Sequence, residues 1–78
     1  MLQKVYITAF LLFAVHTVFA QKTDRDYIRS GNKLYNDSLF IKAEVDYRKA
    51  LDINPKSTDA MFNLANALLM QQKANEAM

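Results

Sequence analysis

Apolar and small residues recur every three or four positions through the middle of the chain, which is the spacing of one face of an α-helix. A first stretch carries this face at Tyr27, Gly31, Leu34 and Tyr35. A second stretch follows a short polar break, and its face contains Phe40, Ala43, Tyr47, Ala50 and Leu51. Small residues alternate with large ones in both stretches, so the two helices can pack closely.

Capping residues predict where these helices begin and end. Thr23, with Asp26 three positions later, has the pattern of a capping box at the start of the first helix. The pair Asn36-Asp37 favours a turn, so this helix is expected to end there. Ser38 is then the expected N-cap of a second helix over residues 39–53.

The remaining chain is expected to be helical as well. Asn54-Pro55 should end the second helix, because proline lacks an N–H and restricts the residue before it. Either Ser57 or Thr58 is expected to cap a third helix over residues 58–71. A fourth helix is expected to begin near Ala74.

The apolar pattern restarts after 34 residues, so that Tyr27 corresponds to Met61 and Gly31 to Ala65. A period of this length with this order of small and large residues resembles the tetratricopeptide repeat. The positions that match the family's signature are Tyr27, Gly31, Leu34, Ala43, Tyr47, Ala50 and Pro55 in the first repeat, and Met61, Leu64, Ala65, Leu68 and Ala77 in the second. Ser38 and Gln72 depart from the pattern, since the family's turn glycine is usual there.

The resemblance implies an all-α fold, a solenoid of antiparallel helix-turn-helix repeats of which about 1.6 are present. Repeat 1 is expected over residues 24–57 and a truncated repeat 2 over residues 58–78, after a short lead-in at 21–23. The sequence predicts that this is the N-terminal part of a longer solenoid.

The N-terminal segment has the pattern of a secretory signal peptide over residues 1–20. Lys4 precedes an uncharged run that ends in small residues, and cleavage is expected between Ala20 and Gln21. A retained anchor and a buried helix are the alternatives, although the 16 uncharged residues reach only about 24 Å against a hydrocarbon core of about 30 Å. We therefore expect export, most simply to the periplasm, with secretion or N-terminal anchoring as alternatives.

The resemblance implies that the first helix of each repeat lines a concave face that binds another protein. By the repeat register, this face contains Arg25, Ile28, Asn32, Tyr35, Asn36, Asp59, Phe62, Asn63, Asn66, Leu69 and Met70. The amides of Asn32 and Asn66 suit the backbone or carboxylate of an extended peptide, although each could instead make a structural contact between helices. A chaperone-type carboxylate clamp is not expected, because Ile28 stands where members with that clamp have a lysine.

Composition excludes several other classes of function. The chain has no cysteine, and its single histidine, His16, lies in the apolar N-terminal run. No convergent set of nucleophile, base and acid is evident, so we expect no catalysis, no metal and no cofactor. The net charge of +2 comes from interspersed charges and gives no basic patch for nucleic acid.

A narrower resemblance points to a cellular role. The strings YIRSGNKLY, AEVDYRKAL and NPKSTDAMFNLANAL are similar to tetratricopeptide proteins of the Bacteroidetes aerotolerance (Bat) operon. That resemblance implies an exported scaffold or adaptor that works beside membrane-anchored partners in a cell-envelope complex. The alternative is the extracytoplasmic sensory part of a larger signalling protein, with an output domain beyond residue 78.

Overall fold

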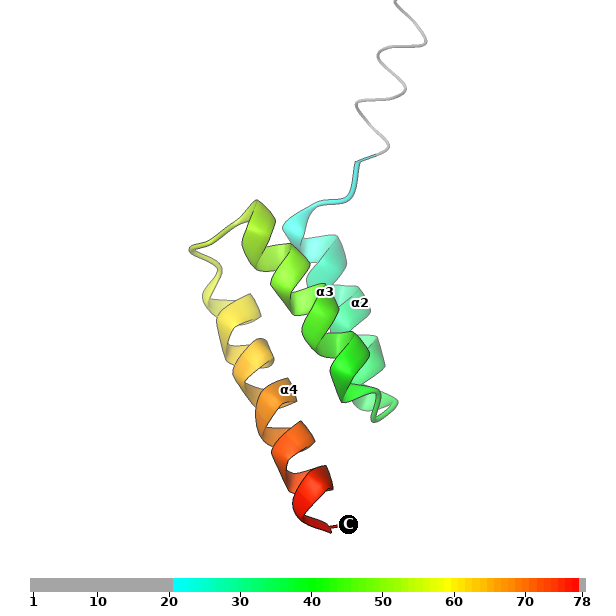
Figure 1. Cartoon of the computed structure of the whole chain (residues 1–78). Helices are drawn as coiled ribbons and strands as arrows, with labels where there is room; N and C mark the ends of the chain where they lie inside the picture. The colour runs from blue at the N-terminus through cyan, green and yellow to red at the C-terminus, as the bar shows by residue number, and fades with distance from the viewer. Residues whose placement is uncertain (1–20, 78) are drawn as a thin grey trace, which may run out of the picture.

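The structure is a computed structural model that describes residues 21–77. These residues form α2 (Asp24–Asn36), α3 (Phe40–Ile53) and α4 (Thr58–Ala77). The helices run alternately down, up and down, with α3 packed against both α2 and α4 (Figure 1). The predicted all-α fold of packed helix-turn-helix units is confirmed for this part of the chain. The predicted signal segment and its cleavage after Ala20 lie outside the described residues.

The N-terminus of α2 is closed by the predicted capping box. The Thr23 hydroxyl accepts a hydrogen bond from the Asp26 backbone N–H at 3.2 Å, and the Asp26 carboxylate accepts one from the Thr23 backbone N–H at 2.9 Å. Hydrogen bonding to the backbone of Thr23, and then to its side chain, lowers the pKa of Asp26 below its ordinary value. The helix ends at Asn36, as the turn-forming pair predicts.

Ser38 was predicted to be the N-cap of the second helix, and the turn between α2 and α3 shows that this prediction is wrong. The N–H of Ser38 donates to the carbonyl of Tyr35, and the N–H of Leu39 donates to the carbonyl of Leu34, both at 2.9 Å. This is a Schellman motif, and Ser38 occupies its left-handed position with φ 61°. A residue in that conformation cannot also be an extended N-cap, so Leu39 precedes α3 without a side-chain cap, and α3 begins at Phe40.

Replacing Ser38 by glycine is expected to stabilise the fold by about 1 kcal/mol, because glycine adopts the left-handed conformation without a Cβ penalty. Urea unfolding followed by circular dichroism measures the change. Ser57→Gly is the matched control, since Ser57 accepts a hydrogen bond from the Ala60 N–H at 3.2 Å and its loss should cost a few tenths of a kcal/mol. A Ser38→Gly variant no more stable than the parent would contradict the account of this turn.

The predicted break after Gln71 is wrong, because α4 is continuous through that residue. The helix continues to Ala77, because residues 70–77 contain neither glycine nor proline and mostly favour helix. Gln71 is also held on α3, where its amide donates to the Glu44 carboxylate at 2.8 Å. Arg48 donates to the other oxygen of that carboxylate, and the hydrogen bonds from Gln71 and then Arg48 lower the pKa of Glu44. The predicted fourth helix near Ala74 is therefore part of α4.

The core lies where α3 meets its two neighbours. Ala43, Tyr47 and Ala67 are buried together, and Leu34, Tyr35 and Leu64 pack partly buried against them. Gly31 is also buried, and a Cβ built on it would lie 2.5 Å from Cε1 of Tyr47. The alternation of small and large residues therefore brings α2 and α3 into close contact.

Candidate functional site

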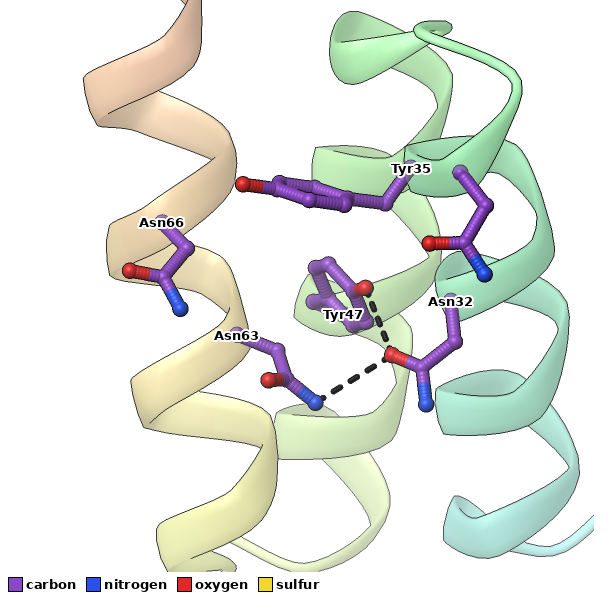
Figure 2. A pocket seen from close by; sticks show the side chains of 6 residues that line it. Asn32, Tyr35, Tyr47, Asn63 and Asn66 are labelled. Carbon is purple, nitrogen blue, oxygen red and sulfur yellow. Dashed lines mark hydrogen bonds between the residues drawn. The ribbon is translucent and has the colours of Figure 1, made fainter.

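A groove of about 340 Å³ lies between α2 and α4, above the middle of α3. Four asparagines and two tyrosines line it: Asn32, Tyr35 and Asn36 from α2, Tyr47 from α3, and Asn63 and Asn66 from α4. Figure 2 shows Asn32, Tyr35, Tyr47 and Asn63 extending into the space between α2 and α4, with Asn66 on the α4 wall. The groove exists because α3 holds α2 and α4 on either side of Tyr47.

Helical spacing explains why the asparagines meet. Asn32 and Asn36 are four residues apart on α2, and Asn63 and Asn66 are three apart on α4, so each pair occupies one helical face. These two faces border the same groove. Tyr47, which is 1% exposed, forms the floor between them.

Asn32 joins the three helices through one carbonyl oxygen. Its Oδ1 accepts a hydrogen bond from the Tyr47 hydroxyl at 2.7 Å and another from the Asn63 amide at 3.2 Å. These are the hydrogen bonds drawn among the groove side chains in Figure 2, and neither involves Asn36 or Asn66. Asn32 and Asn63 thus make a contact between helices, whereas within residues 21–77 the side chains of Asn36 and Asn66 make no hydrogen bond.

The lining of the groove is uncharged. Burial raises the pKa of the Tyr47 phenol, and the neighbouring Tyr35 and Asp46 raise it further. The phenol therefore stays protonated at neutral pH and donates to Asn32. A ligand in this groove meets amide and phenol groups rather than a side-chain cation or carboxylate.

The stability of the fold is expected to fall above pH 10, because the Tyr47 phenol ionises near pH 10.0 when unfolded but at a higher pH when folded. This contribution is fully present below the unfolded pKa and is lost as the pH rises through the folded pKa. Unfolding free energies measured across this range should show a smaller alkaline decline in Tyr47→Phe than in the parent. Tyr27→Phe, at a half-buried ring, is the control and should keep the decline.

The groove collects five of the residues predicted for the concave face: Asn32, Tyr35, Asn36, Asn63 and Asn66. The other predicted members do not line it. Of these, Arg25, Asp59, Phe62 and Leu69 are exposed, and Ile28 and Met70 are half-buried. Tyr47 was predicted only as a packing position. The available signal for its second role was the tyrosine hydroxyl itself, which usually finds a hydrogen-bond partner when the ring is buried.

The signature positions divide by exposure. In the first repeat Gly31, Ala43, Tyr47 and Ala50 are buried, Tyr27 and Leu34 are half-buried, and Pro55 is exposed. In the second repeat Leu64 is half-buried, whereas Met61, Ala65, Leu68 and Ala77 are exposed. The α4 residues that are buried are Ala60 and Ala67, which the sequence analysis did not single out. Their separation of seven residues was the available signal for this face.

The described part of the chain lacks two further kinds of site. Residues 21–77 contain no group of three or more His, Cys, Asp or Glu side chains placed to hold a metal ion. Among the same residues, no helix is both long and apolar enough to cross a membrane.

Comparison with known proteins identifies a repeat in the C-terminal part of the chain. Residues 46–78 match the family model described as the tetratricopeptide repeat. The matched segment takes in the second half of α3, the turn that follows, and α4. No curated protein and no solved structure matches the chain. The predicted repeat boundaries at residues 24–57 and 58–78 stay a prediction.

Proposed function

We propose that this chain, which carries a tetratricopeptide repeat in residues 46–78, is an exported interaction module that binds an extended segment of a partner polypeptide in the groove between α2 and α4. Tetratricopeptide repeats bind other proteins and are typically non-catalytic. The observation that carries the proposal is the cluster of four asparagines around the Tyr47 ring.

The chemistry of the groove favours the main chain of a peptide. An extended peptide offers alternating N–H donors and C=O acceptors, and an asparagine amide can satisfy both. Asn36 lies on the α2 wall and Asn66 on the α4 wall, so a strand between them can be held from both sides. A terminal carboxylate is less well suited, since no cation lines the groove.

The combined change Asn36→Ala and Asn66→Ala is expected to weaken peptide binding about tenfold or more. Each change removes a hydrogen bond to the ligand at a cost of roughly 1 kcal/mol, and a total of about 1.4 kcal/mol already corresponds to tenfold. The probes are peptides selected by the parent protein from a displayed random library, and fluorescence anisotropy gives their dissociation constants. Asn75→Ala, an exposed change farther along α4, is the control. Equal affinities for the parent and the double variant would refute binding in this groove.

The cellular setting is part of the same proposal. The uncharged N-terminal run and the Bat-type strings support export to the periplasm, where the chain would act as a scaffold or adaptor for membrane-anchored partners of a cell-envelope complex. Mass spectrometry of the mature protein is expected to find Gln21 at its N-terminus. A protein that keeps Met1 and stays in the cytoplasmic fraction would contradict export.

A further inference from the structure

Gln21 is exposed and lies outside the helices, because α2 begins only at Asp24. Among the hydrogen bonds at this end of α2, within residues 21–77, none involves the Gln21 side chain. Its carboxamide is therefore accessible and unconstrained by the rest of the fold.

The two residues that follow Gln21 are held by contacts with α2. The Lys22 ammonium lies 5.4 Å from the centroid of the Tyr27 ring, within the range of a cation–π interaction. The Thr23 backbone N–H donates to the Asp26 carboxylate in the capping box. The contacts that fix the start of the fold thus begin immediately after Gln21.

Cleavage between Ala20 and Gln21, which is part of the function proposed above, would give Gln21 a primary α-amine. Such an amine titrates near about pH 8, so an uncharged, nucleophilic fraction is present at neutral pH. The amine nitrogen and the side-chain carbonyl carbon Cδ belong to the same residue, and joining them closes an unstrained five-membered ring. A reaction between two groups of one residue is strongly favoured over the same reaction between separate molecules.

The ring closure needs no cofactor and no oxidant. The bond between the α-amine nitrogen and Cδ forms, and the bond between Cδ and Nε2 breaks. Nε2 leaves as ammonia and takes the proton that the amine gives up. The product is a neutral lactam, pyroglutamate, so the chain end loses its positive charge, as it does on acetylation.

We propose that Gln21 is a modification site, at which the mature N-terminus cyclises to pyroglutamate. This inference rests on the export and cleavage proposed above. The lactam lacks the free α-amine that aminopeptidases require, and chain ends are where proteolysis concentrates. Because only Lys22 separates Gln21 from Thr23, the modification protects the capping box that closes α2 from trimming.

Intact-mass spectrometry of the protein exported from the full 78-residue chain tests the proposal. The main species is expected to be one ammonia lighter than the uncyclised chain that begins at Gln21, and fragmentation should place the loss at that residue. Gln21→Asn is the matched control, since it keeps the carboxamide but could close only a strained four-membered ring. After incubation at neutral pH, the cyclised fraction is expected to be at least about tenfold larger in the parent than in this variant.

Digestion with an aminopeptidase is the second readout. The parent should keep residues 21–23, whereas the Gln21→Asn variant should lose them and the capping box with them. A mature chain that begins at Gln21 and keeps its free α-amine overturns the cyclisation and leaves export standing. A chain that begins at any other residue overturns both proposals, and equal trimming of parent and variant overturns the protective role of the lactam.

Discussion

Replacing Tyr47 by alanine is expected to unfold most of the described helices at room temperature. Its ring is 1% exposed and lies where α2, α3 and α4 meet, and its hydroxyl holds Asn32. Truncating a buried aromatic residue costs about 3–5 kcal/mol, and small domains often have only about 5 kcal/mol of stability in total. The loss should appear as a large fall in helical circular dichroism at 25 °C or in the urea midpoint.

Tyr47→Phe separates packing from hydrogen bonding at the same position. It keeps the ring and removes only the donor to Asn32, so it should cost about 1 kcal/mol. Lys42→Ala, on the exposed side of α3, should have little effect. If Tyr47→Ala unfolds at the same urea concentration as Tyr47→Phe, the ring does not hold the three helices together.

Replacing Gly31 by alanine is expected to destabilise the protein, although the same change stabilises an isolated helix. The added Cβ would lie 2.5 Å from Cε1 and 2.8 Å from Cδ1 of Tyr47. These atoms belong to a buried ring whose hydroxyl donates a hydrogen bond to Asn32. The ring therefore cannot move aside without losing packing contacts or that hydrogen bond. Overpacking costs about 1–3 kcal/mol, while the gain in helix propensity is about 1 kcal/mol, and Gly31→Val should lose more.

A double-mutant cycle tests this contact. Gly31→Ala should cost less in a Tyr47→Leu background, where the ring is gone, than in the parent. Lys33→Ala is the control on the same helix, because its side chain is exposed. Additive losses in the cycle, or a Gly31→Ala protein more stable than the parent, would show that α2 and α3 do not rely on this close approach.

The first helix could be predicted well because its signals are local. The capping box at Thr23 and Asp26 and the turn at Asn36 each involve residues close in sequence, and the structure contains both. The start of α3 was misplaced because Ser38 is a good N-cap by type. Its actual conformation depends on how Leu34 and Tyr35 end α2, which residue type alone does not reveal.

The end of α4 shows the limit of reasoning from a repeat. A turn was expected near Gln71 because the first repeat turns at the equivalent place, but α4 has no local signal that ends a helix there. The same register aligns Met61, Ala65 and Leu68 with Tyr27, Gly31 and Leu34, and this assignment of repeat positions stays a prediction. These α4 residues are exposed in the described structure, while the buried contact with α3 is made by Ala60 and Ala67.

The candidate site was only partly predictable, because repeat register predicts which face a residue lies on but not the hydrogen bonds it makes. Repeat register brought Asn32, Asn63 and Asn66 to the concave face, and all three line the groove. Register alone does not reveal which of these amides make hydrogen bonds within the protein. That distinction depends on the position of the Tyr47 hydroxyl, a property of three helices packed together.

The hydrogen bond from the Asn63 amide to the Asn32 carbonyl affects how the two walls of the groove are held relative to each other. Helix α4 packs mainly on α3 and touches α2 little, and this bond links the two walls directly across the groove. Without it, α2 and α4 would be joined chiefly through their common contacts with α3. A peptide that replaced the Asn63 amide at Asn32 would therefore exchange one hydrogen bond for another, while the packing of α4 on α3 through Ala67 and the Gln71–Glu44 hydrogen bond stays in place.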